Sequence, residues 1–185
     1  MGINGWLNTV GKVERGGGLE IAVPDDHPLL DTAPTRLPVW WGWRGPVCRT
    51  GGGPSHSGRC VVLRIEKRFT RLERFLARLL RAPNVVMRPL DDMNSLVWEL
   101  SDGAHRFQDI VAAMDATFHE DAAPVIERVT LAIHGFRDLG LMTVNPRPGA
   151  PLWSTEPGLV PTGQNIMPRS PDLDVSDGGP RDPQA

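Results

Sequence analysis

The sequence predicts a mainly α-helical protein. A small three-helix domain with short flanking strands follows a basic amphipathic helix, and both ends of the chain are disordered. Two observations lead to this fold class. Glycine and proline, which supply 20 and 18 of the 185 residues, largely avoid the middle of the chain. Within that middle part, apolar residues recur at the spacing of one helix face.

The distribution of glycine and proline also predicts the domain boundaries. Residues 64–144 contain only Gly103, Gly135, Gly140, Pro83, Pro89 and Pro124. Segments rich in these residues bury too little apolar surface to offset the entropy of ordering. We therefore predict a folded part at 64–144 and a Pro-rich disordered tail at 145–185.

The segment 1–63 has no helical or strand periodicity. We predict that it is disordered, or that it is translated from GC-rich DNA upstream of the true start codon. Trp40, Trp41 and Trp43 are then isolated apolar residues in a coil, or alternatively an aromatic binding knob.

Residues 64–82 are predicted to form a basic amphipathic helix. Its apolar stripe is Ile65, Phe69, Leu72, Leu76 and Leu79. Residues 64–81 carry seven Arg or Lys against two Glu, a net charge of +5, whereas 84–144 carry four Arg against ten acids, a net charge of −6. Three interpretations stay open: packing on the following domain or on a dimer mate, binding an acidic protein, or contact with a membrane surface or RNA.

Residues 84–144 are predicted to form the compact domain. The expected elements are a strand at "NVVMR" closed by Pro89, a helix from Asp91 or Asp92 to Leu100, a helix over Phe107–Phe118, a helix from about Pro124 to Leu139, and a closing strand at "LMTV". Asp102-Gly103 stops the first helix, because glycine adopts the left-handed conformation just past a helix end. This outline is typical of a winged-helix-like domain.

Charge and side-chain chemistry exclude several functions. Acidic residues on the second and third predicted helices argue against a nucleic-acid partner, which needs a basic face. No acid–base pair can be placed, and His119-Glu120-Asp121 lies in one helix break without a second group of ligands. His105 and His134 are isolated, and Cys48 and Cys60 are a weak metal or disulfide signal. We predict no enzyme activity, no metal and no cofactor.

No run of about 18 apolar residues is present, and the N-terminus lacks the apolar core of a signal peptide. We therefore predict a cytoplasmic location.

The stretch "PLDDMNSLVWELSDGAHRFQDIVAAM" resembles the PqqD family, the pyrroloquinoline-quinone synthesis protein D group. Leu90 to Gly103 fits the family spacing without a gap, and "FRDLGLMTV" resembles its closing Leu-x-x-x-Gly-Leu. The resemblance covers 84–144. Asp91, Met93-Asn94 and Arg106 depart from the usual Asn, Thr-Ala and Thr, and no strands are evident upstream of "NVVMR". These features identify a divergent member.

The resemblance implies a non-catalytic protein that recognises a ribosomally made precursor peptide. The leader peptide would add as a strand beside the third strand and lie against the third helix, while a tailoring enzyme, often of the radical S-adenosylmethionine type, modifies the core. The product would be pyrroloquinoline quinone or a related modified peptide. Main-chain bonds at a strand edge give affinity and side-chain pockets give choice.

The predicted peptide-binding residues are Val85, Val86, Met87 and Arg88 on the strand and Ile126, Thr130, Ile133 and Arg137 on the third helix. Asp102 and Gly103 are predicted to be structural. As an alternative, Ile126 and Ile133 widen the core. The alternative function is a winged-helix transcriptional regulator or a structural adaptor.

Overall fold

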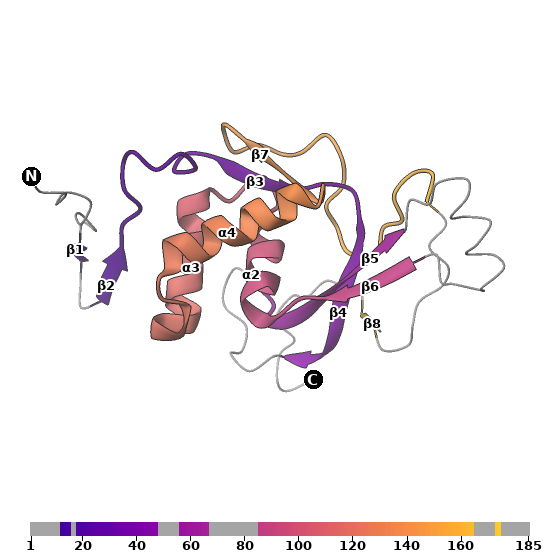
Figure 1. Ribbon diagram of the computed structural model, residues 1–185, viewed down its shortest axis with the longest axis horizontal. Helices are drawn as coiled ribbons and strands as arrows, with labels where there is room; N and C mark the ends of the chain where they lie inside the picture. The colour runs from indigo at the N-terminus through magenta and orange to yellow at the C-terminus, as the bar shows by residue number, and fades with distance from the viewer. Residues whose placement is uncertain (1–11, 16–17, 48–55, 67–84, 165–172, 175–185) are drawn as a thin grey trace, which may run out of the picture.

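The computed structural model describes residues 12–15, 18–47, 56–66, 85–164 and 173–174. Its strands are β1 (Lys12–Arg15), β2 (Gly18–Ile21), β3 (Ala33–Arg36), β4 (Trp40–Val47), β5 (Arg59–Glu66), β6 (Val85–Pro89), β7 (Met142–Asn145) and β8 (Leu173–Asp174). Its helices are α2 (Asp92–Leu100), α3 (Phe107–Phe118), the 3₁₀ helix η1 (His119–Ala122) and α4 (Val125–Asp138). Figure 1 shows these elements along the chain.

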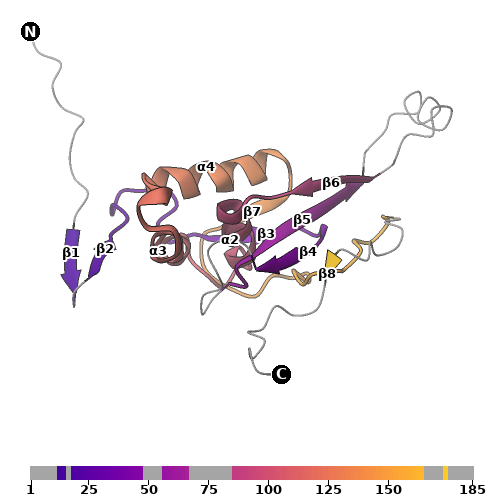
Figure 2. The ribbon, with the colours of Figure 1, turned by 90° about the horizontal axis from the view of Figure 1, so that it is seen from below.

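The strands form antiparallel sheets, and this corrects the predicted fold class. Four strands pair in the order β6-β5-β4-β8, β3 pairs with β7, and β1 pairs with β2. The protein is therefore an α+β fold with strands and helices in comparable amounts, and the mainly α prediction is wrong. The helices gather beside the four-stranded sheet, with α2 packed against β5 (Figures 1 and 2).

The first 63 residues supply much of this sheet, so the prediction of disorder is wrong for residues 21–47 and 56–63. Trp40, Trp41 and Trp43 are buried in β4, and neither a coil nor an exposed knob describes them. They escape a search for periodicity because residues on both sides of the strand are buried: Trp41 and Trp43 face the large core, and Trp40 faces a smaller cluster.

Two further predicted boundaries change. Residues 64–66, expected to begin the basic helix, belong to β5, and the rest of that helix lies outside the described residues. The predicted tail is ordered over 146–164. The Trp153 indole donates to Arg36 O at 2.7 Å, and the Trp41 indole donates to Thr155 O at 3.0 Å. Residues 173–174 form β8.

The three helices lie where the apolar spacing placed them, and their ends are set locally. The Asp91 carboxylate accepts the Asn94 N–H at 2.7 Å at the start of α2. Arg106 is a poor capping residue for α3. The Asp109 carboxylate caps this end instead, because its Oδ2 accepts the Arg106 N–H at 2.8 Å. Gly140, with φ +67°, ends the turn after α4.

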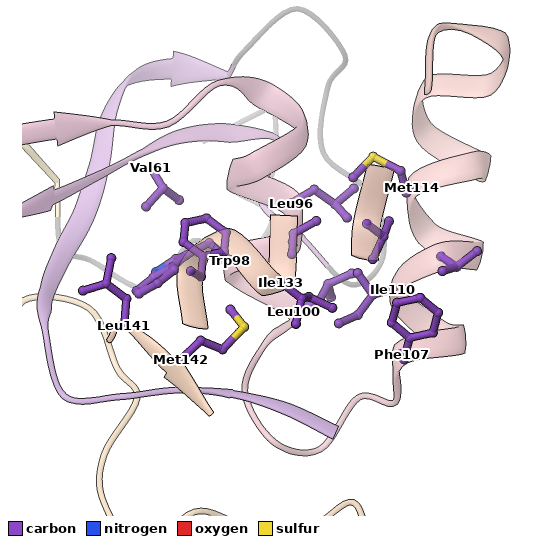
Figure 3. Close-up of a cluster of buried hydrophobic side chains, with 14 of the residues drawn as sticks. Val61, Leu96, Trp98, Leu100, Phe107, Ile110, Met114, Ile133, Leu141 and Met142 are labelled. Atoms are coloured by element: carbon purple, nitrogen blue, oxygen red, sulfur yellow. The ribbon is translucent and has the colours of Figure 1, made fainter. Parts of the chain in front are cut away.

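Trp98 lies at the centre of the large core and is fully buried. Its ring makes edge contacts with Trp41 and Phe136, at centroid distances of 6.5 and 5.3 Å. Figure 3 shows side chains of β5, all three helices and β7 around it. The core therefore joins the N-terminal strands to the helices in one folded unit.

Cys60 is disulfide-bonded, so the disulfide alternative holds for it. Disulfides persist mainly in oxidising compartments, so this bond argues against the cytoplasmic location, which stays a prediction. Within the described ranges, no helix is both long enough and apolar enough to cross a bilayer.

Candidate functional site

The candidate site is the edge of the four-stranded sheet formed by β6. β6 pairs antiparallel with β5, and no other described strand pairs with it. The register sets Val86 opposite Ile65 and Arg88 opposite Leu63. The sequence analysis found no strands upstream of "NVVMR", but the structure has β4 and β5 there. β4, β5 and β6 follow one another along the chain and are also neighbours in the sheet, so β6 is the third strand of this series.

The register also fixes which backbone groups face outward. Leu90 N–H donates to Val61 O at 2.8 Å, so Leu90 and Val61 occupy a hydrogen-bonded position. Such positions alternate along an antiparallel ladder. Val86 and Arg88 therefore bond to β5, whereas Val85 and Met87 turn their N–H and C=O groups to the open edge. Pro89 occupies an outward position too, where its missing N–H removes no bond from the ladder.

The β6 side chains divide between the two faces of the sheet. Val86 and Arg88 share a face with Ile65 and Leu63, which belong to the large core on the helical side. Val85 and Met87 point the other way, and Val85 packs on the small cluster of Trp40, Val62 and Leu173. Val86 is 40 % exposed and Met87 48 % exposed. The edge thus offers main-chain groups that no described strand pairs with, between two accessible apolar side chains.

The structure does not bring together the four predicted residues of α4. Ile133 is fully buried in the core, so its assignment to the peptide surface is wrong and the core interpretation holds for it. Ile126 packs partly against that core and lines a pocket beside Thr130, whose other wall is segment 21–27. No β6 residue lines this pocket. Arg137 is exposed.

The other flank of α4 carries small or exposed residues. At 100° per residue, Ala132, Gly135 and Leu139 lie on the side opposite Thr130. Leu139 is 49 % exposed, and a Cβ added at Gly135 would meet nothing within 4 Å. Figure 2 shows α4 and β6 at the same side of the molecule, and α4 contacts α2, the helix that follows β6. The sequence could not choose between the flanks because both border the buried stripe.

Asp102 and Gly103 form a turn that anchors two distant segments. Gly103 has φ +86°, and a Cβ there would lie 2.9 Å from Thr35 Oγ1 and from Gly149 O. Gly103 N–H donates to Pro34 O at 3.1 Å, and Gly149 N–H donates to Gly103 O at 2.8 Å. The predicted helix stop is thus also the point where the N-terminal and C-terminal segments are tied together.

The Asp102 carboxylate organises this turn. It accepts the backbone N–H groups of Ala104 and His105 and lies 3.0 Å from His105 Nδ1. Partial burial raises its pKa, but the hydrogen bonds from His105 and Ala104 outweigh that effect and lower the pKa to about 2. The same bond to Asp102 raises the pKa of His105.

Arg36 is a buried cation that the sequence analysis did not single out. Its Nη1 donates to Trp98 O at 2.7 Å and to Glu99 O at 3.0 Å, at the C-terminal end of α2. Burial lowers its pKa to about 10. The guanidinium also lies 4.7 Å from the Trp41 ring centroid. It satisfies carbonyls that a helix end leaves unpaired, which is a structural role.

Comparisons with protein-family models, with curated proteins and with solved structures found no match to this chain.

Proposed function

We propose that this protein is a non-catalytic peptide-binding accessory protein, which holds the leader of a ribosomally made precursor peptide for a tailoring enzyme. The observation that carries the proposal is the open edge of β6. Val85 and Met87 direct their main-chain groups outward there, and no described strand covers them. A bare edge is a ready template for an added strand, which proteins ordinarily protect.

The position of α4 on the same side of the molecule as this edge favours a peptide over another sheet (Figure 2). A strand added to β6 would direct alternate side chains to the helical side, where Val86 and Arg88 point. We assign the opposing wall to Ala132, Gly135 and Leu139, in place of the flank of Ile126 and Thr130. The small side chains at 132 and 135 leave room for a chain to approach the helix, and Leu139 offers an apolar contact.

The surface charge gives less support to the regulator alternative. The exposed charges of α4 are Glu127, Arg128, Arg137 and Asp138, which balance. A helix that reads DNA needs a basic surface against phosphate. A backbone-directed peptide site has no such requirement, because main-chain hydrogen bonds supply much of its affinity.

The test is an amide-shift titration of the full chain with the leader of a precursor peptide encoded beside its gene. Saturable shifts confined to β6 and the Ala132–Gly135–Leu139 flank are the expected result. The decisive variant is Met87→Pro, which deletes an outward N–H without removing a bond to β5. We expect at least about a fivefold loss of leader affinity, since one lost backbone hydrogen bond and the clash of the proline ring both weaken strand addition.

Met87→Ala is the matched control, because it removes the same side chain and keeps the N–H. It should bind with less than about a twofold to threefold change, since Met87 is half exposed. Equal affinity of the proline and alanine variants, in proteins with unchanged circular dichroism, would contradict strand addition at β6. Absence of any shift in the folded wild-type chain would contradict the proposed function itself.

A further inference from the structure

A second candidate site lies on the other flank of α4, in a pocket of about 800 Å³. Three parts of the chain enclose it: segment 21–27, the C-terminal end of α3 with η1, and the first turns of α4. Its lining includes Ile21, Pro24, Asp115, Glu120, Ile126 and Glu127. This volume lies within the range of pockets that bind ligands.

The wall contributed by segment 21–27 is fixed by His27. Leu29 N–H donates to His27 Nδ1 at 3.3 Å, so in the neutral ring the proton is on Nε2, which faces Thr130 Oγ1 at 3.4 Å. The imidazole also stacks on Phe107, with ring centroids 4.8 Å apart. These contacts hold the segment against α3 and α4, so the pocket is formed before any ligand arrives.

The chemistry of the lining combines an apolar floor with an acidic rim. Ile21, Pro24, Val125 and Ile126 are apolar, whereas none of the lining residues in the described ranges is Lys or Arg. Its carboxylates come from three different elements: Asp115 from α3, Glu120 from η1 and Glu127 from α4. In the described part of the chain, none of the three forms an ion pair.

We propose that this pocket docks a basic amphipathic segment of a partner protein. Its apolar side chains would enter the pocket and its Arg or Lys residues would meet the rim. A single amine would face one carboxylate, whereas carboxylates on three elements suit several cations along a chain. Leu131, which is 71 % exposed, continues the apolar surface outward along α4. The site lies on the opposite flank of α4 from the one proposed for the leader peptide and is independent of it.

The probe is a fluorescein-labelled synthetic peptide, RFTRLERFLARLLR, which has the sequence of residues 68–81 and the required pattern of apolar and basic residues. Fluorescence anisotropy with the full chain measures its affinity. The test variant is the double change Glu120→Gln and Glu127→Gln. The matched control is Asp121→Asn and Asp138→Asn, which alters charge equally at exposed acids that do not line the pocket. A peptide of the same composition without helical periodicity tests the apolar requirement.

We expect saturable binding that weakens about five- to tenfold in the Gln double variant and less than twofold in the Asn control, because each rim charge contributes a modest, salt-screened attraction. Leu131→Gln should weaken binding about threefold. The proposal is overturned if the folded wild-type chain does not bind the probe, if the two double variants bind equally, or if the aperiodic peptide binds as well. Met87→Pro should leave this binding unchanged, so failure here is separable from failure at β6.

Discussion

The rest of the chain treats the two outer strands of the β6-β5-β4 ladder differently. At one edge, β4 is covered: β8 pairs with Trp43 and Arg44, and Gly158 N–H donates to Trp41 O at 2.8 Å. At the other edge, β6 meets no described strand. An uncovered edge invites pairing with other chains, and proteins commonly protect it. A fold that covers one edge with its own C-terminal segment, and whose described strands leave the other edge without a partner, has a surface suited to an added strand.

The largest expected effect on stability tests which β6 backbone groups face β5 and which face outward. The comparison of the two edges depends on this assignment. Val86→Pro removes an N–H that bonds to β5, so we expect it to lower the free energy of unfolding by about 3 kcal/mol. Met87→Pro removes an outward N–H and should lower the free energy of unfolding by less than about 1 kcal/mol. Urea denaturation of both variants measures the difference. A larger loss for Met87→Pro than for Val86→Pro would reverse the assigned alternation and break the comparison.

The next effect concerns the covered edge. Leu173 is only 7 % exposed and packs on Trp40 and Val62. Leu173→Ala should therefore lower the free energy of unfolding by about 2 kcal/mol, as truncation of buried leucines does. Leu159→Ala is the control, because Leu159 belongs to the same C-terminal segment and is 46 % exposed. It should cost less than about 0.5 kcal/mol.

If β8 only covers the edge, Leu173→Ala leaves leader affinity at β6 unchanged. A loss of affinity equal to that of Met87→Pro would show that the two edges are coupled. The two edges would then belong to a single site and could not be treated as separate surfaces.

The comparison also shows what the sequence could reveal. Helices α2, α3 and α4 were predictable because the two stop signals, Asp102-Gly103 and Gly140, bracket apolar residues at helical spacing. β4 was not predictable, because the residues Trp40 and Trp41, which point to opposite faces, are both buried and leave no alternation to detect. The cover on its edge comes from Gly158 and Leu173, more than 100 residues away in the chain, and no local pattern encodes such a pairing.

The site was partly predictable for the same reason. The strand "NVVMR" has β-branched residues and a closing proline, so β6 was expected, and the outward position of Pro89 agrees with a strand at an edge. Which flank of α4 lines the pocket depends on where segment 21–27 lies. That segment has no periodicity of its own, and its position is set by the contacts of His27 with Phe107 and Thr130.

The smallest effect concerns the turn that anchors the covering segments. The pKa of Asp102 is lowered from 3.8 to about 2, so its contribution to stability is present above pH 3.8 and is lost as the pH falls from about 4 to 2. After allowance for solvent screening of this partly exposed group, the loss should be about 1 kcal/mol. Asp102→Asn should flatten the pH dependence of the urea midpoint over this range.

The loss of stability at low pH should affect the covered edge of the sheet before the β6 edge. Gly103 bonds to Pro34 and Gly149, so protonation of Asp102 loosens the segments that run toward the covered edge and leaves the β5–β6 ladder intact. Hydrogen exchange should accordingly quicken at Gly103, Gly149 and Gly158 below pH 4, relative to the intrinsic rates, before it quickens at Val86 and Arg88. Faster exchange at β6 first would mean that the open edge, and not the cover, is the less stable side of the sheet.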